Sequence, residues 1–509
     1  MVATAERRIL YTITVNNRAT RYHGLVRKVG AAPWRRDKLS ILLIASVYPR
    51  PQYETYMRNP LLLLLFALIN ACAVLDPHNI VGRIGVPGAP SNVPVPELNS
   101  SEWKRDAFES VWNTVNDKYY DPKLNGVNWQ AVRASYEPKI FAAATDDRYW
   151  ELLDKMTGEL KDSHTRVQGP KQVAQQRDHE VHSLGLGFLE MDGTLVVTST
   201  HSESDPWWAG VRPGMAIKTI DGEPAMALYH RLLDEVRDSS TPWARTRGAL
   251  RKILAGDPDT TITMTFVRMD GSEIAATMKR RKFRAPPEFT QRVLPSGFAY
   301  IRFSNFVGSM ENGILQAITD MKSGPGMIVD LRNNGGGSLG MANVLASKFL
   351  SQPQQGARIL TRTGKPITVA FIPTMKLQTE LRGDKQSAYT KPLVILTNES
   401  SASASEIFSG TLQDLGRATI VGQRTCGCLL GYLGYADLPG GGQLAYSELG
   451  FVTPKGNRIE GAGVKPDVEI TLARDDILFN RDRVLEAAEG LLKAKTSKHP
   501  ELQTTGKNE

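Results

Sequence analysis

The chain has 509 residues, of which 41% are hydrophobic and 23% charged, so it is long enough for several globular domains and is not a disordered chain. Its net charge of +9 is concentrated at one end: residues 1–56 hold ten Arg or Lys and three acids, which accounts for +7 and leaves +2 for the remainder. This charge distribution gives no reason to expect a nucleic-acid partner. Three cysteines cannot build a disulfide framework, and no His/Cys cluster has zinc spacing, so neither a metal nor a cofactor is expected.

An export signal is predicted at residues 57–72, where Arg58 precedes an apolar run and Cys72 follows it. This layout is typical of a secretory signal peptide and is too short for a comfortable membrane span. The segment ending at Cys72 also resembles a bacterial lipobox, in which the cysteine is lipidated, although Asn70 is not the usual small residue. The alternatives are an ordinary signal peptide and a membrane-anchoring helix.

A signal that starts at Met57 leaves residues 1–56 as a non-structural extension outside the working protein; the alternative is an unusually long leader. Residues 73–100 are rich in proline and are expected to form a linker. The protein is therefore expected in the cell envelope, exported and held at the membrane by a lipid anchor, facing the periplasm or the exterior.

An N-terminal helical domain is predicted over residues 101–178. Apolar residues recur at three- and four-residue spacing from Trp103 to Val115, which indicates an amphipathic helix. Further helices are predicted over 129–143 and 147–160, and the last of them leads to a Ser-His pair.

Residues 179–284 contain two motifs in order, GLGF at 185–188 and AGVRPGMAIKTIDG at 209–222. Together they resemble a PDZ domain, in which backbone N–H groups of the GLGF loop capture a peptide C-terminal carboxylate while the peptide adds a strand to the sheet. The resemblance implies that the peptide is bound by Gly185, Leu186, Gly187 and Phe188. The alternative is a β-rich module with a glycine turn and no peptide role, and the segment 226–255 is longer than the usual PDZ helix region.

Buried strands and helices alternate from residue 298 to residue 423, which is typical of an α/β layer fold. The predicted fold class is therefore multidomain α+β: an N-terminal helical domain, a PDZ-like β module and an α/β core. The core, residues 285–480, is expected to have ββα-type, crotonase- or Clp-like layers. Residues 481–509 are expected to form a C-terminal helix and tail.

Two strand-to-helix junctions carry the chemistry. In DLRNNGGGS (330–338), three glycines let backbone N–H groups approach a ligand closely. In NESSASASEI (398–407), a serine stands at a helix start, where free N–H groups and the helix dipole favour a developing oxyanion. Taken singly, the glycine run can be explained as a tight turn and the serine segment as a capping box, without any catalytic role. At the ends of consecutive core strands, the pair indicates a serine nucleophile.

The order DLRNNGG, SASASEI, GQRTCG and GVKPDVE resembles that of the C-terminal-processing (tail-specific) and tricorn-type serine peptidases, over about residues 101–475. The resemblance implies hydrolysis of peptides or unstructured protein tails through an acyl-enzyme. It makes Ser403 the nucleophile, with Ser401 and Ser405 as competitors. It also implies that the oxyanion is bound by the N–H of Ala404 and by that of Gly336 or Gly337.

The family's processing branch uses a lysine base 25 residues after the serine and a glutamine four residues later, but this chain has Cys428 and Tyr432 there. The tricorn branch uses histidine and glutamate, which match His164 and Glu460. An imidazole suits a general base because its ordinary pKa is near 6.5, and a carboxylate can orient it. The predicted site is therefore Ser403, His164 and Glu460, with Ser163 in support.

Cys426 and Cys428 are expected to be free buried thiols; a disulfide between them is the second possibility and a cysteine nucleophile a distant third. The leading hypothesis is an exported serine endopeptidase of Ser-His-Glu type. The alternatives are a catalytically inactive, PDZ-bearing, peptide-binding envelope lipoprotein, because the usual lysine is missing, and a hydrolase of another class on the same scaffold.

Overall fold

The computed structural model describes residues 11–15, 18–22, 102–177, 181–283, 288–369 and 372–497. The chain divides into two units, one of them Met1–Gly85 with Pro366–Met375 and the other Val86–Lys365 with Lys376–Glu509. In the first unit, two antiparallel pairs form: β1 (Tyr11–Val15) with β2 (Arg18–Tyr22), and β16 (Thr368–Val369) with β17 (Ile372–Pro373). The predicted signal segment 57–72 with Cys72, and the linker 73–100, lie outside the described residues.

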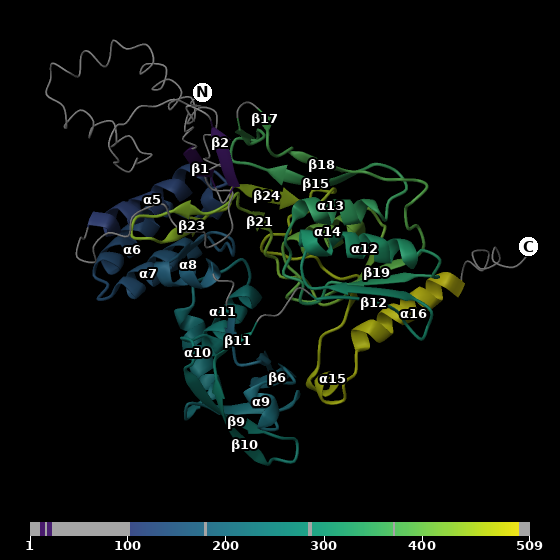
Figure 1. Ribbon diagram of the computed structural model, residues 1–509, viewed down its shortest axis with the longest axis horizontal. Coiled ribbons are helices and arrows are strands. Elements are labelled where there is room, and N and C mark those ends of the chain that lie inside the picture. Colours follow the sequence, from purple (N-terminus) through teal and green to yellow (C-terminus); the bar gives the residue numbers. More distant parts are fainter. Residues whose placement is uncertain are drawn as a thin grey trace, which may run out of the picture. The chain divides into compact units, whose positions relative to one another are not determined.

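The helices that follow residue 101 form one group, drawn in blue in Figure 1. They enclose a core rich in aromatic side chains. They are α5 (Glu102–Lys118), the short η1 (Leu124–Gly126), α6 (Trp129–Phe141), α7 (Asp146–Gly158) and α8 (Pro170–Arg177). The apolar stripe predicted for the first helix is buried along α5. α7 begins where the Thr145 hydroxyl accepts the N–H of Arg148 at 3.2 Å. The three predicted helices are therefore confirmed, with boundaries shifted by one or two residues.

A separate sheet is built from residues 181–283, with the strand order β10-β9-β7-β6-β5 and β8 beside β7. Its strands are β5 (Leu186–Met191), β6 (Thr194–Thr200), β7 (Ala216–Ile220), β8 (Glu223–Pro224), β9 (Thr261–Val267) and β10 (Glu273–Lys279). Helices α9 (Asp205–Trp208), α10 (Ala225–Glu235) and α11 (Pro242–Leu254) complete this module, and β4 (Val181–Ser183) pairs with β11 (Arg281–Phe283). The long segment 226–255 is thus a helix pair.

The C-terminal half is organised on a six-stranded sheet of order β12-β13-β14-β19-β20-β25, parallel except for the first pair. The strands are β12 (Phe289–Val293), β13 (Ala299–Phe303), β14 (Met327–Asp330), β19 (Leu393–Thr397), β20 (Thr419–Gly422) and β25 (Val468–Glu469). The connecting helices are α12 (Gly308–Asp320), α13 (Leu339–Ser347), α14 (Ala404–Asp414), α15 (Arg474–Leu478) and α16 (Arg483–Ser497).

Alternate residues of the central strands face two different layers of helices. Ile328 packs in the cluster that includes Leu492 of α16, whereas the next residue, Val329, lines an apolar cluster with Leu345 of α13 and Phe408 of α14. Both faces of the sheet are therefore covered, which explains why these strands read as continuous apolar runs. Because parallel strands share their direction, β14 and β19 bring their carboxyl ends, and the two junctions predicted from sequence, to the same edge.

A smaller sheet of order β18-β15-β24-β21 lies in the same unit, built from β15 (Gln354–Leu360), β18 (Gln378–Leu381), β21 (Leu430–Gly431) and β24 (Leu449–Val452). β22 (Ala436–Asp437) and β23 (Gln443–Ala445) form a third sheet with β3 (Arg166–Gln168), which follows α7. The β3–β23 pairing brings the residues after α7 to the C-terminal half. The chain is a mixed helix-and-sheet multidomain protein, as predicted. In the described ranges, no helix is long and apolar enough to cross a membrane.

Candidate active site

Ser403 stands at the turn between β19 and the first residue of α14. Its backbone has φ 56° and ψ −116°, a conformation that costs a non-glycine residue on the order of 1–3 kcal/mol. Residues held in this way persist only where the surrounding structure fixes them. The following residue, Ala404, begins the helix, and its N–H forms no hydrogen bond with any described residue. The turn therefore presents a serine beside an unsatisfied helix N-terminus.

The competing serines of the SASAS segment have other partners. The buried hydroxyl of Ser401 donates to the carbonyl of Leu331 at 2.7 Å, and that of Ser405 donates to the carbonyl of Asn334 at 2.9 Å. Both hydroxyls therefore tie the serine turn to the glycine turn. Within the described residues, Ser403 Oγ has no hydrogen-bond partner, so Ser403 is the one of the three whose hydroxyl is available for chemistry.

The glycine turn lies directly against the serine. A Cβ on Gly336 would come within 2.7 Å of Ser403 Cβ and 2.9 Å of the Ala404 nitrogen, which only glycine avoids. The N–H of Gly336 already donates to Asn334 Oδ1 at 2.9 Å. The N–H of Gly337 has no partner among the described residues. Of the two glycines expected to supply an oxyanion donor, Gly337 is therefore the one with a free N–H.

His164 lies in the loop between α7 and β3. Its backbone N–H donates to Asp162 Oδ1 at 2.7 Å, while its ring nitrogen Nδ1 is enclosed and has no described hydrogen-bond partner. Burial lowers the pKa of His164 to about 4; the negative charge of Asp162 opposes this shift, and Arg166 adds to it. The imidazole is thus neutral over the ordinary pH range and keeps a free nitrogen.

Glu460 is buried, and its Oε2 accepts the N–H of Leu429 at 2.5 Å, while its Oε1 is enclosed without a described partner. Burial raises the pKa of Glu460 well above its ordinary value, and the charge of Asp162 raises it further. Asp162 acts on both His164 and Glu460, so the two groups occupy one buried region. No hydrogen bond joins His164 to Ser403 or to Glu460 in the described structure.

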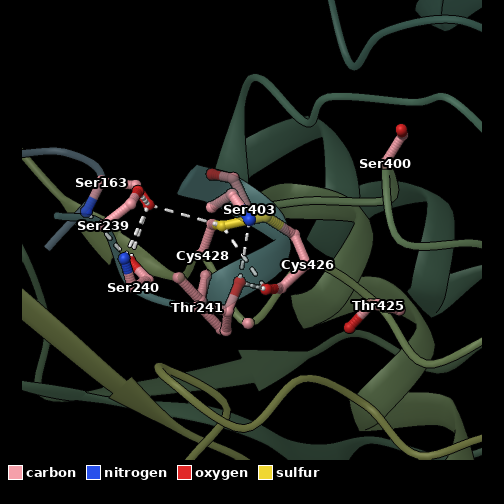
Figure 2. The surroundings of a disulfide bond; sticks show 12 residues. Ser163, Ser239, Ser240, Thr241, Ser400, Ser403, Thr425, Cys426 and Cys428 are labelled. Atoms are coloured by element: carbon pink, nitrogen blue, oxygen red, sulfur yellow. Dashed lines mark hydrogen bonds between the residues drawn. A yellow bond between two sulfur atoms is a disulfide. The ribbon is translucent and has the colours of Figure 1, made fainter. Parts of the chain in front are cut away.

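Ser163 does not contact the nucleophile. Its hydroxyl lies 2.7 Å from the Ser239 hydroxyl, 2.8 Å from that of Ser240 and 3.5 Å from the sulfur of Cys428 (Figure 2). Short hydroxyl side chains, together with Arg237, which donates to the Asp162 carbonyl at 2.8 Å, therefore link the α10–α11 segment to the loop that carries His164. Ser163 holds that loop in place.

Cys426 and Cys428 form a disulfide, so the expectation of two free thiols is wrong (Figure 2). Two residues of such close spacing can meet here because Gly427 between them adopts φ 67°, which favours glycine. The backbone of the same loop holds the serine turn: the Cys428 carbonyl accepts the N–H of Ser403 at 3.2 Å. The position at which the resemblance led us to expect a lysine is thus occupied by half of a disulfide beside Ser403.

The carboxylate of Glu406 connects the serine turn to the loop that carries the disulfide. It accepts hydrogen bonds from the backbone of Ser403 at 2.9 Å, Gly427 at 2.7 Å and Cys428 at 3.1 Å, and from the Thr425 hydroxyl at 2.6 Å. Burial raises its pKa to about 7, although all four donors oppose the shift. In the sequence, Glu406 was recognisable only as the N3 residue of a capping box that begins at Ser403. Its hydrogen bonds to the loop 425–428 depend on tertiary structure and could not be foreseen.

The GLGF segment opens β5 at the edge of its sheet. Gly185 has φ 68°, Leu186 and Phe188 are buried in the module's core, and a Cβ on Gly187 would meet the Ser199 hydroxyl at 2.5 Å. The two apolar side chains therefore support the strand from inside. Because β5 ends the sheet order, its outer backbone groups are placed where a further strand could pair.

No group of three or more His, Cys, Asp or Glu side chains in the described ranges is arranged to hold a metal ion. What the site offers is a strained serine, two unpartnered backbone N–H groups, a neutral imidazole and a buried carboxylate. These are the components of acyl transfer by a serine nucleophile.

Comparison with known proteins leads to the same class. Residues 297–470 match the model of Peptidase family S41, and residues 101–158 match that of the Tricorn protease C1 domain. The chloroplastic C-terminal processing peptidase of Tetradesmus obliquus is 30% identical over 379 residues, covering 71% of this chain and 76% of that protein. The chloroplastic carboxyl-terminal-processing peptidase 3 of Arabidopsis thaliana is 26% identical, covering 72% and 69%.

Two solved structures share the fold. The photosystem II D1 C-terminal processing protease has a TM-score of 0.50 at 23% identity and covers 78% of this chain and 99% of that one. Mature CPAF complexed with lactacystin has a TM-score of 0.60 at 16% identity and covers 78% and 100%. The chain is a serine peptidase, a hydrolase of peptide bonds. It belongs to Peptidase family S41, the family of the C-terminal processing peptidases, as its motifs predicted.

Proposed function

We propose that this protein is an exported endopeptidase that cleaves peptides or unstructured protein tails by a Ser-His-Glu mechanism. Ser403 is the nucleophile, His164 the general base and Glu460 the group that orients the imidazole. The observation that carries the proposal is Ser403 itself: a serine with positive φ and an unpartnered hydroxyl, placed between the free N–H groups of Ala404 and Gly337.

In the proposed reaction, Ser403 Oγ attacks the scissile carbonyl carbon while His164 takes the hydroxyl proton. The tetrahedral oxyanion accepts hydrogen bonds from Ala404 and Gly337; loss of one such donor typically costs about 3–4 kcal/mol of transition-state stabilisation. His164 then gives its proton to the leaving amine, which leaves an acyl-enzyme on Ser403 that water hydrolyses. His164 must approach Ser403 for this step, and its unpartnered Nδ1 leaves the ring free to do so.

The domain organisation expected from sequence supports this role. In our proposal, residues 101–178 are a helical domain that supplies His164, and residues 179–284 are a PDZ-like module whose GLGF segment pairs with a substrate C-terminus. Residues 285–480 are the catalytic core, with crotonase- or Clp-like layers. The edge position of β5 favours strand addition of a peptide. Export through residues 57–72 and lipidation at Cys72 place the enzyme in the cell envelope.

The decisive experiment is labelling with a serine-reactive phosphonate, read by intact mass, in wild type and in Ser403→Ala, Ser401→Ala and Ser405→Ala. Only Ser403→Ala should lose both the label and hydrolysis of an unstructured protein while keeping the wild-type circular dichroism spectrum. Labelling and cleavage at wild-type rate by a folded Ser403→Ala protein would refute the nucleophile assignment. A folded wild type that binds peptides but takes no label would instead be a peptide-binding protein without catalysis.

A further inference from the structure

Arg166 is a cation without a carboxylate partner beside the proposed base. It follows His164 by two residues and begins β3, where its side chain is half-buried. Its guanidinium donates to the Tyr435 hydroxyl at 2.5 Å and lies 5.4 Å from the ring centroid of Tyr432. The Tyr432 ring in turn lies 6.3 Å from the imidazole of His164. The Tyr432 ring is therefore a neighbour of both this positive charge and the proposed base.

Two further arginines, both on α11, also lack a carboxylate partner among the described residues. Arg247 and Arg251 stand one helical turn apart, on the same side of the helix, and Arg251 Nε donates to the Arg247 carbonyl at 3.4 Å. Burial lowers the pKa of both guanidinium groups, and the charge of Arg166 lowers that of Arg251 further. The Arg251 side chain is nevertheless solvent-exposed, and that of Arg247 is half-buried. The positive charge of Arg166 therefore acts on that of Arg251.

Three other arginines are neutralised by carboxylates, whereas Arg280 and Arg417, which also lack an ion pair in the described ranges, donate to backbone carbonyls. Arg133 pairs with Glu109, Arg237 with Asp154, and Arg332 with Asp330 and Asp482. By contrast, no ion pair joins Arg166, Arg247 or Arg251 to a carboxylate within the described ranges. Removing a positive charge from water without a counter-charge is costly, and grouping like charges adds to that cost. Such an arrangement is stabilised when an anion binds.

We infer that Arg166 and Arg251 form a subsite for a carboxylate group of the substrate peptide, next to the scissile bond. This inference rests on the proposed function, because it assumes that a peptide lies across His164. An extended peptide advances about 3.3 Å per residue, so the carboxylate belongs to a residue one to three positions from the bond that is cut. A guanidinium fork held by Tyr435 presents its remaining N–H groups for charge-assisted bonds, which are stronger than neutral ones.

The carboxylate can come from an Asp or Glu side chain or from the peptide's own C-terminus, and the experiment separates these sources. Quenched fluorogenic peptides carry one Glu, or Gln as its neutral isostere, at each of three positions on either side of the scissile bond, with the C-terminus free or amidated. We expect one position at which the acidic form is cleaved with roughly tenfold or greater advantage in kcat/KM. The advantage should shrink as salt is raised.

Arg166→Gln keeps a donor for Tyr435 but removes the charge, so the acid-to-amide ratio should fall to about 1, whatever happens to the neutral peptide. Arg251→Gln should reduce the ratio by less. Arg231→Gln serves as the matched control, because Arg231 is an exposed arginine of α10 that pairs with Glu223; it should keep the wild-type ratio. Arg166→Glu should reverse the preference towards a lysine-containing peptide. Each variant is compared at equal folded fraction, measured by thermal unfolding.

A wild type with no acid preference at any position overturns the subsite, and so does a preference that survives both Arg166→Gln and Arg251→Gln. Should the wild type fail to cleave any peptide, the proposed function is what fails. The subsite is then tested by fluorescence anisotropy of the same labelled peptides on the Ser403→Ala protein. Tighter binding of the acidic peptide, lost in Ser403→Ala combined with Arg166→Gln, supports it; equal binding of acidic and neutral peptides overturns it.

Discussion

The backbone N–H of Ser403 donates to the buried carboxylate of Glu406 at 2.9 Å, and the same oxygen also accepts the N–H of Cys428. One side chain on the first turn of α14 therefore holds both the proposed nucleophile and the loop in which the family resemblance had led us to expect a lysine. The carboxylate has no arginine or lysine partner in the described structure and is satisfied entirely by neutral donors, which is why burial prevails and raises its pKa.

Glu406→Gln should destabilise the fold and reduce catalysis. An amide NH₂ in place of one carboxylate oxygen would face two N–H or O–H donors, and each donor left unsatisfied costs roughly 1–3 kcal/mol. We expect a loss of about 2–5 kcal/mol in the free energy of unfolding and a fall of ten- to a hundredfold in kcat, because the φ of Ser403 is no longer fixed. Urea unfolding and steady-state kinetics measure the two effects. Glu288→Gln, at an exposed carboxylate, is the control.

The free energy of unfolding should depend differently on pH in the wild type and in Glu406→Gln. The folded-state pKa of Glu406, about 7, lies above the ordinary 4.5, so its protonated form is favoured in the folded state. Its contribution to stability is therefore full below about pH 4.5 and is lost as pH rises through 7, a change of about 3 kcal/mol. Relative to Glu406→Gln, the wild type should lose stability between pH 4.5 and 8. Parallel curves for the two proteins would show that Glu406 stays ionised.

Gly336→Ala should inactivate the enzyme, whereas Gly335→Ala should be tolerated. A Cβ at 336 would lie 2.6 Å from the Ala402 carbonyl oxygen and 2.7 Å from Ser403 Cβ, at a φ of +96°. A Cβ at 335 meets nothing within 4 Å. Strain and overpacking should cost Gly336→Ala about 2–4 kcal/mol of stability, with kcat/KM at least a hundredfold lower. Gly335→Ala should stay within about threefold of wild type, and equal effects of the two changes would contradict the close approach.

The sequence predicted the helical stripe of α5, the buried core strands and the SASAS turn, because each is a local pattern with a fixed period or a fixed order of small residues. The resemblance to the peptidase family also limited the expected glycine donor of the oxyanion site to Gly336 or Gly337. The choice between them depends on the Asn334 side chain, which occupies the N–H of Gly336. The missing partner of Arg166 and the Cys426–Cys428 bond likewise depend on segments brought together from distant parts of the chain, which no local pattern records.

Reducing the Cys426–Cys428 disulfide should lower activity several-fold without unfolding the protein. Cys426 donates its N–H to the Ser401 carbonyl at 2.9 Å and the Cys428 carbonyl accepts that of Ser403, so the bond restrains both sides of the nucleophile's turn. Closing so small a loop contributes only about 1–2 kcal/mol by chain entropy. Activity before and after treatment with a dithiol measures the effect. A Cys426→Ala, Cys428→Ala double variant should have the reduced enzyme's activity and no response to the dithiol.

Export should depend on residues 57–72 and membrane attachment on Cys72. Expressed from Met57, the protein should fractionate with membranes, and Cys72→Ser should release it into the soluble envelope fraction, because each buried methylene of a lipid contributes about 0.8 kcal/mol. Fractionation followed by immunoblotting measures this, with Cys426→Ala as a cysteine control. Deleting residues 1–56 should leave both location and activity unchanged. Equal membrane retention of wild type and Cys72→Ser would rule out the lipid anchor.

The pH dependence of catalysis should report Glu460 rather than His164. The ordinary imidazole pKa near 6.5 would place the ionisation of the base near neutral pH, but burial lowers the pKa of His164 to about 4, so the base is already neutral above that pH. Burial raises the pKa of Glu460, and the carboxylate form is the one that stabilises an imidazolium. In wild type, kcat/KM should therefore keep rising well above pH 4.5, as Glu460 ionises. Glu460→Gln should fold and bind peptide but lose activity by several orders of magnitude. Its residual rate should fall only below about pH 4, where His164 becomes protonated.

His164→Ala should lose this residual pH dependence as well, while Lys455→Ala and Lys465→Ala should change the activity little. Activity that survives His164→Ala and vanishes with one of these lysines would mean a Ser-Lys mechanism and would refute the roles given to His164 and Glu460.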